Sequence, residues 1–157
     1  MNIEDFKGLM DAFDPLSLLP EIGEVTGAMA GIARFIVLIG PVTLLVMGLI
    51  YLFTTPKEAN HHWGYRTYFG MGSVEAWRYS QRLAGFAFGG LGLLLSIVML
   101  LVTGSFGRMD TMDLLGRAVS CMIWEAVLAL IAWLAVNIIL IVRFDRKGDL
   151  RKNKVKR

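Results

Sequence analysis

The stretch FIVLIGPVTLLVMGLIYLF, Phe35 to Phe53, carries no charge. A helix rises ~1.5 Å per residue, so the stretch is long enough to cross ~30 Å of hydrocarbon. Two similar stretches follow, at 83–107 and 118–142, and Glu125 is the one charge within them. Strands are excluded, because an open sheet edge does not survive in lipid and three strands cannot close a barrel. The sequence predicts an all-α integral membrane protein with transmembrane helices over about 33–54, 83–104 and 118–142.

The composition agrees with this prediction. Of the 157 residues, 55% are hydrophobic and 18% are charged, whereas a soluble domain usually has about 25% charged residues. The one cysteine, Cys121, excludes an internal disulfide. We therefore expect residues 1–157 to form a single membrane domain.

The basic residues are distributed unevenly along the chain. The tail, 143–157, holds eight Lys or Arg against two Asp, and the loop between the first two spans holds four basic residues. The loop between the second and third spans holds two, and the first 34 residues hold two against six acidic residues. Cytoplasmic segments collect Lys and Arg. The predicted topology is therefore N-terminus outside and C-terminus inside, with a basic cytoplasmic tail.

Residues 1–30 are predicted to form an interfacial segment rather than a span. Asp14 and Pro15 have the form of an N-cap followed by proline in the first turn of a helix. An apolar stripe would let that amphipathic helix lie on the outer leaflet; its residues are Leu9, Phe13, Leu16 and Leu19. The alternative is a lid or acidic rim that meets a cationic ligand.

The loop before the second span contains NHHWGYRTYFGMGSVEAWRYSQR, residues 60–82. Ser73 can cap a helix with Glu75 in its first turn, and this helix would continue into the second span. Arg78 suits a lipid phosphate. Four aromatic residues suit the membrane–water interface; they are Trp63, Tyr65, Tyr68 and Trp77.

The same loop contains an ordered motif. It begins with Asn60, Gly64, Tyr65, Arg66 and Thr67 and continues with Glu75, Trp77, Gln81 and Arg82. In its order and spacing this pattern resembles the SdpI family of bacterial membrane proteins. The similarity covers the end of the first span, the loop and the second span, about half of the chain.

The resemblance implies a short, three-helix member of that family, equivalent to the C-terminal half of a longer one. It implies a multi-pass protein of the bacterial inner (cytoplasmic) membrane that confers immunity to, or senses, a membrane-active peptide toxin on the outer face. It also implies signalling through a cytoplasmic regulator, such as a transcriptional repressor held at the membrane. These roles are binding and signalling, not catalysis.

Glu125 is the most informative residue within the spans. It lies about 10 Å from the outer end of the third helix, where an ionisable group is costly and normally faces the bundle interior or water. Ser96 and Thr43 fall at similar depth, so the three are predicted to form one polar layer. Its role is either a structural hydrogen bond between helices, a proton-linked pathway or a toxin contact. The alternative function is therefore a small proton-coupled transporter or channel subunit, an oligomer around Glu125.

Small residues recur on one face of the second span, at Gly85, Gly89 and Ser96, and again at Gly27 and Gly31. Such faces admit close helix packing, more often within a chain than between chains. Because three spans make a thin bundle, we also expect a homo-oligomer.

Other classes of function find little support. His61 and His62 are adjacent and would point ~100° apart on a helix, and no further ligand has metal spacing. No set of catalytic residues or phosphate-binding glycine motif is present, so we predict no enzyme and no cofactor. Membrane flanks leave too little surface for nucleic acid.

The basic tail is predicted to bind anionic lipid headgroups, with a cytoplasmic protein partner as the alternative. Its first basic residues are Arg143, Arg146 and Lys147.

Overall fold

The computed structural model describes residues 22–56, 58–59 and 62–151. These residues form three long helices, α2 (Ile22–Phe53), α3 (Val74–Thr103) and α4 (Thr111–Arg143), with a 3-10 turn, η2 (Phe106–Arg108), between α3 and α4. The described ranges contain no strand, only an isolated bridge between Phe144 and Leu150. The all-α prediction is confirmed for this part of the chain. The predicted N-terminal amphipathic helix lies at residues outside it.

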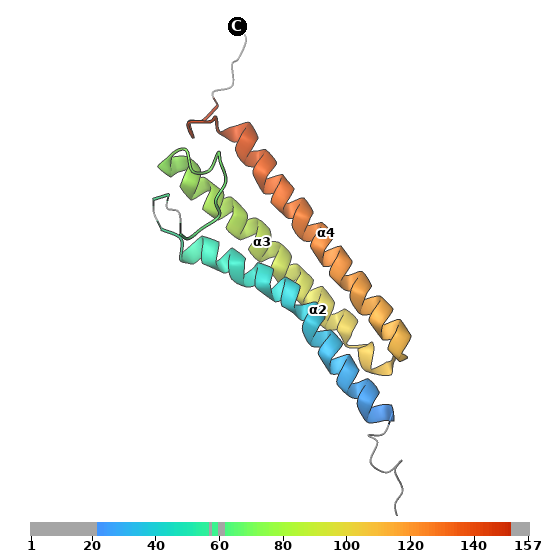
Figure 1. Ribbon diagram of the computed structural model, residues 1–157. Coiled ribbons are helices and arrows are strands. Elements are labelled where there is room, and N and C mark those ends of the chain that lie inside the picture. The colour runs from blue at the N-terminus through green and yellow to red at the C-terminus, as the bar shows by residue number, and fades with distance from the viewer. Residues whose placement is uncertain (1–21, 57, 60–61, 152–157) are drawn as a thin grey trace, which may run out of the picture.

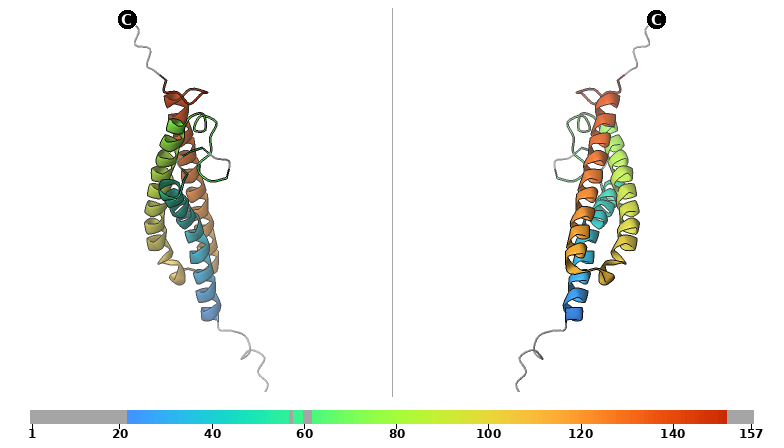
Figure 2. Two further views of the ribbon diagram at one scale, coloured as in Figure 1. Left: turned by 90° about the vertical axis from the view of Figure 1, so that its left-hand side faces the viewer. Right: turned by 90° about the vertical axis from the view of Figure 1, so that its right-hand side faces the viewer.

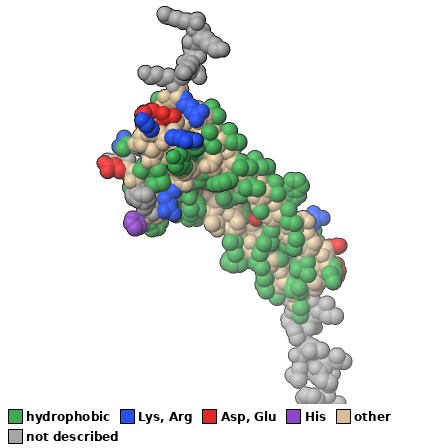
Figure 3. All heavy atoms as spheres, turned by 45° about the horizontal axis from the view of Figure 1, so that its top comes forward, with side chains coloured by type: hydrophobic (Ala, Val, Ile, Leu, Met, Phe, Trp, Pro, Cys, Tyr) green, Lys and Arg blue, Asp and Glu red, His purple; other side chains and the backbone are tan. Residues whose placement is uncertain are grey.

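Three segments are long and apolar enough to cross a membrane: Val25–Phe53 in α2, Val74–Arg108 from α3 through η2, and Thr111–Arg143, which is α4. Hydrophobic side chains cover the long middle of the bundle, and charged side chains gather toward its ends (Figure 3). This arrangement indicates a multi-pass membrane protein. Each helix begins before the span expected from the sequence; α2 already begins at Ile22, so 22–30 continue directly into the first span.

The helices form an elongated bundle (Figures 1 and 2). The α2–α3 loop and the segment after α4 lie at one end, and the α3–α4 connection lies at the other. Pro41 lies inside α2, where it removes one helical hydrogen bond. Figure 1 shows α2 changing direction part-way along its length.

Glycines bring α2 and α3 into close contact. A Cβ on Gly48 of α2 would overlap the backbone of Gly89, and one on Gly92 of α3 would overlap the backbone of Leu45. A Cβ on Gly85 would lie 2.5 Å from the side chain of Leu52. The expectation that the small-residue face of the second span serves packing within the chain is thus confirmed.

The first turns of α2 are less enclosed. Built Cβ atoms on Gly27 and Gly31 meet nothing within 4 Å. Further along, Arg34 Nε donates to the carbonyl of Thr103 at 3.2 Å and ties α2 to the end of α3.

Two apolar clusters join the three helices. One includes Val37 of α2, Leu95 of α3 and Leu114 of α4. The other lies toward the α2–α3 loop and includes Phe88 of α3 and Val136 of α4.

Candidate functional site

The α2–α3 loop is attached to α3 through the side-chain amide of Gln81. The N–H of Tyr65 donates to Gln81 Oε1 at 2.7 Å, and Gln81 Nε2 donates to the Tyr65 carbonyl at 2.8 Å. Gln81 and Tyr65 are only 4% and 7% exposed. One side chain thereby satisfies both backbone groups of a buried loop residue, as a neighbouring strand would do.

Trp77 and Gly64 make a second attachment. Trp77 is fully buried, and its indole Nε1 donates to the carbonyl of Pro56 at 2.9 Å. Gly64 has φ +112°, and a Cβ at this position would lie 2.7 Å from the Trp77 ring. Glycine is therefore required here both by its backbone conformation and by the indole beside it.

Tyr65 connects the loop to all three helices. Its ring lies against Tyr51 of α2 and Phe88 of α3, with centroid distances of 5.8 and 5.7 Å. Its hydroxyl oxygen accepts a hydrogen bond from Asn137 Nδ2 of α4 at 2.9 Å. Burial raises the pKa of the Tyr65 hydroxyl, and the hydrogen bond from Asn137 opposes this shift. The phenol is thus a neutral structural group at ordinary pH.

The four aromatic residues of the loop divide into two pairs. Trp63 and Tyr68 are 61% and 70% exposed, which fits an interfacial position. Tyr65 and Trp77 do not face the surroundings as an aromatic belt would, because both side chains are buried and their polar atoms are hydrogen-bonded inside the protein. Sequence could not separate the pairs, since the same residue types serve both roles.

The other motif residues lie around this interlocked group. Thr67 is half-buried, and its Oγ1 accepts from the N–H of Gly70 at 3.0 Å. Three motif side chains are exposed: Arg66, Glu75 and Arg82. Asn60 lies outside the described residues.

Ser73 joins the loop to the segment after α4. As predicted, it is the N-cap of α3: its Oγ accepts from the N–H of Ala76 at 3.1 Å, and Glu75 lies in the first turn. The same hydroxyl donates to the carbonyl of Gly148 at 2.7 Å. Residues 62–73 and 144–151 therefore form one structure, which we call the cap.

The second half of the cap is a compact turn. Asp145 Oδ1 accepts from the N–H groups of Lys147 and Asp149, both at 2.9 Å. The N–H of Arg151 donates to the Arg143 carbonyl at 2.9 Å and closes the turn. The first part of the basic tail is thus folded against the loop.

Basic side chains surround the cap (Figure 3). The Arg143 guanidinium lies 4.4 Å from the centroid of the Tyr79 ring, a cation–π contact. The other basic residues predicted to bind lipid are also exposed; they are Arg78, Arg146 and Lys147.

Comparisons with protein-family profiles, curated proteins and solved structures find no match to this chain.

Glu125 lies between α4 and α2. It is 6% exposed, and its Oε1 has no hydrogen-bond partner among the described residues. A Cβ on Gly40 of α2 would lie 2.7 Å from Glu125 Oε2, so the absence of a side chain there makes room for the carboxyl. Sequence analysis missed Gly40, because nothing in the chain marks which helix faces Glu125.

The other two residues of the predicted polar layer do not bond to Glu125. The Ser96 hydroxyl donates to the Gly92 carbonyl of its own helix at 2.7 Å. Thr43 is on an exposed face of α2. Asn137 of α4 was also not singled out in the sequence analysis. This residue is a hydrogen-bond partner of Tyr65, not of Glu125.

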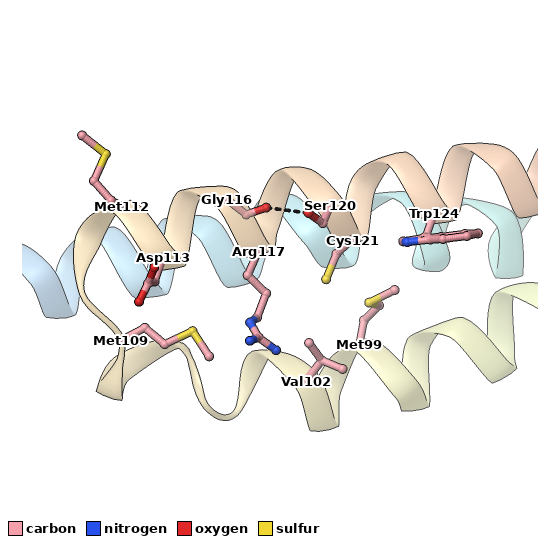
Figure 4. A pocket seen from close by; sticks show the side chains of 10 residues that line it. All are labelled: Met99, Val102, Met109, Met112, Asp113, Gly116, Arg117, Ser120, Cys121 and Trp124. Atoms are coloured by element: carbon pink, nitrogen blue, oxygen red, sulfur yellow. Dashed lines mark hydrogen bonds between the residues drawn. The ribbon is translucent and has the colours of Figure 1, made fainter.

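A pocket of about 800 Å³ lies between the end of α3 and the start of α4 (Figure 4). Arg117 extends from α4 toward the facing helix, between Met109 and Met99, whereas Met112 points away. Asp113 and Cys121 also line it. No group of three or more His, Cys, Asp or Glu residues suited to a metal ion occurs in the described ranges.

Proposed function

We propose that this chain is a short SdpI-like protein of the bacterial cytoplasmic membrane that binds a membrane-active peptide and thereby gives immunity to it or senses it. The N-terminus would lie outside, and the cap and the basic tail would lie inside. The function is binding and signalling.

The observation that carries this proposal is the double hydrogen bond between Gln81 and Tyr65, with Trp77 packed over Gly64. Residues that define the resemblance, although separated in sequence, act together as one structural unit. The motif residues are therefore parts of one local structure rather than independent positions. Three motif side chains are exposed on the cap and on the first turns of α3, where a cytoplasmic regulator would bind: Arg66, Glu75 and Arg82.

The peptide would enter at the opposite end of the bundle. The 800 Å³ pocket there combines a cation and an anion, Arg117 and Asp113, with methionines. Methionine side chains adapt their shape to varied apolar partners. An amphipathic peptide that arrives at the outer face would meet this surface first.

Lipid binding and self-association complete the proposal. Exposed basic residues at the cap, Arg78, Arg146 and Lys147, would bind anionic headgroups at about 1 kcal/mol each. Large apolar side chains such as Trp124, Ile131 and Ile138 of α4 are 63%, 55% and 58% exposed. These faces would contact lipid or further copies in a homo-oligomer.

The test uses bacteria that express the chain and are exposed to a panel of secreted membrane-depolarising peptides, with membrane potential and survival as readouts. We expect protection against at least one peptide, lost in Arg117→Ala and in Arg66→Ala but kept in the lipid-facing control Phe86→Leu. Equal depolarisation with and without the chain, across the panel, would refute the proposal.

A second function is favoured by one observation, the buried Glu125 whose Oε1 has no partner. A carboxyl of this kind within a span suits a proton-coupled transporter or channel subunit. In reconstituted vesicles with an imposed pH gradient, Glu125→Gln should abolish proton flux and leave helical content unchanged. Equal flux in wild type, Glu125→Gln and empty vesicles would exclude this function.

A further inference from the structure

A groove of about 470 Å³ runs between α2 and α4 around Glu125. Its walls are apolar, with Ile36 and Ile39 from α2 and Met122 and Ala129 from α4, and Glu125 is the one ionisable residue that lines it. The volume falls within the ~300–1,000 Å³ usual for small-molecule sites, which are mostly apolar with a few placed polar groups.

The carboxyl of Glu125 has hydrogen-bonding capacity that the described protein groups leave unused. The side chain is 6% exposed and its Oε1 is fully enclosed with no partner. A buried polar atom without a partner is costly and is normally satisfied. The notch at Gly40 accommodates the carboxyl but supplies no side-chain donor to it.

The groove opens sideways, toward the place that lipid would occupy. Ile36, Ile39 and Met122 at its rim are 43%, 49% and 44% exposed. Glu125 lies eight residues beyond Arg117 on α4, about 12 Å along the axis. A lipid headgroup at the interface would not reach this depth, whereas a slender apolar molecule dissolved in the bilayer would.

We propose that this groove binds a lipid-soluble primary amine, with its ammonium on the Glu125 carboxylate and its alkyl chain between α2 and α4. The ammonium brings N–H donors and a positive charge to a carboxylate in a medium of low dielectric constant. Such charge-assisted hydrogen bonds are among the stronger polar contacts in proteins. The apolar walls match the chain of the ligand.

This inference goes beyond peptide binding at the outer pocket. It also holds whether or not the amine is carried across the membrane. Amine binding in a protein that shows no proton flux would exclude the transporter function and leave the proposed site intact.

The experiment measures equilibrium binding of radiolabelled dodecylamine to the full chain in phosphatidylcholine nanodiscs, with empty nanodiscs subtracted. We expect saturable binding with one amine per chain. Glu125→Gln keeps the size of the side chain and removes its charge, and should weaken binding by at least about tenfold. The control Glu58→Gln removes an exposed carboxylate outside the groove and should leave affinity unchanged. No saturable binding, or equal affinity in Glu125→Gln, would overturn the proposal.

A second pair of variants separates loss of the site from loss of the fold. Ala129→Leu fills the groove without altering the carboxyl, whereas Ala135→Leu adds the same bulk on an exposed part of α4 outside it. With normal helical circular dichroism, Ala129→Leu should abolish binding and Ala135→Leu should not. Unchanged binding in Ala129→Leu overturns the proposal, whatever the folding of Glu125→Gln.

Competitors identify the chemistry of the occupant. Dodecyltrimethylammonium has the charge but no N–H, and dodecanol has a donor but no charge, so both should compete more weakly than unlabelled dodecylamine. Equal competition by either contradicts the proposed recognition. If a lysine-bearing apolar peptide displaces dodecylamine at far lower concentration than unlabelled amine does, the occupant is a peptide and the proposal is wrong. A dimer that Glu125→Gln dissociates, together with no amine binding, would instead assign the groove to a second copy of the chain.

Discussion

Replacing Gln81 with leucine removes one of the two attachments between the loop and α3, the pair of hydrogen bonds to Tyr65, while keeping a buried side chain of similar size. Gln81 Oε1 and Nε2 are the partners of the Tyr65 N–H and carbonyl, at 2.7 and 2.8 Å. Leucine offers neither a donor nor an acceptor. Because Tyr65 is 7% exposed, water has little access to the two backbone groups that would be left unpaired.

The magnitude follows from these two groups. A buried donor or acceptor left without a partner costs about 1–3 kcal/mol, and the added apolar burial of leucine offsets part of the sum. We expect the free energy of unfolding to fall by about 2–4 kcal/mol. The lost stability should come from the cap end, since the glycine contacts between α2 and α3 are unchanged.

The assay is titration of the detergent-solubilised protein with sodium dodecyl sulfate, followed by tryptophan fluorescence and helical circular dichroism. Trp77 is a suitable reporter because its buried ring lies over Gly64. Phe86→Leu serves as the control. Because Phe86 is 70% exposed, this substitution should change the midpoint of the titration little. An unchanged midpoint for Gln81→Leu would refute the assignment of Gln81 as the attachment of the loop.

Gln81→Glu tests the same hydrogen bonds through pH. An ionised carboxylate can accept from the Tyr65 N–H but faces the Tyr65 carbonyl oxygen without a donor. A protonated carboxyl can serve both groups. The variant should therefore be less stable than wild type in alkaline buffer and recover as the pH falls, whereas wild type should show no such recovery in the same titration.

Three further substitutions test contacts elsewhere. Gly48→Ala should lower the free energy of unfolding by about 1–3 kcal/mol, because its methyl group overlaps the Gly89 backbone, whereas Gly27→Ala should change it little; equal effects would contradict the packing of α2 on α3. Ser73→Ala removes both the N-cap of α3 and the hydrogen bond to Gly148. It should lower the free energy of unfolding by about 1–2 kcal/mol and speed hydrogen exchange in the turn after α4. Unchanged exchange would mean that Ser73 does not hold the turn against the loop. Gly148→Ala imposes a side chain at φ +78°, at a cost of about 1–3 kcal/mol; wild-type stability in the same titration would mean that the turn does not adopt this backbone.

The three helices could be predicted because a membrane span depends on local properties of the sequence, its length and its apolarity. Uncharged stretches around Phe35–Phe53 and the two later ones have the length and apolarity of spans, and lipid leaves the backbone few alternatives to a helix. Ser73 was likewise predictable as an N-cap, since capping involves residues only three apart. The glycine face of α3 was recognisable because small residues permit close approach whichever helix is the neighbour.

The cap could not be predicted, because its contacts join residues distant in sequence. Ser73 bonds to Gly148 across 75 positions, and Asn137 to Tyr65 across 72. The basic tail illustrates the consequence. Its composition predicts lipid binding for the whole segment, yet 144–151 fold into a turn against the loop. Composition describes what a surface attracts, but not which backbone groups are already paired.

Glu125 shows the same limit within the spans. Its depth could be counted from the sequence, and so could the depths of Ser96 and Thr43. Depth alone does not give the direction of a side chain around the helix axis, and the carboxyl proved to lie beside a glycine of α2, Gly40. A missing side chain leaves no chemical signal, so a sequence reveals the ionisable residue more readily than the space made for it.

The motif that resembles the SdpI family has buried members and exposed members, and the two groups bear on different questions. Gly64 and Tyr65 of the cap interlock with Trp77 and Gln81 of α3, and any protein that needs this loop geometry would need residues of these kinds, whatever it binds. These residues bear on the geometry of the loop and not on what the protein binds. A shared function has to be sought in the exposed members, such as Arg66 and Arg82, because a binding partner can reach their side chains. A substitution at Arg66 that leaves the unfolding midpoint unchanged but removes protection against a peptide would therefore be stronger support for the proposed function than any substitution at Gln81.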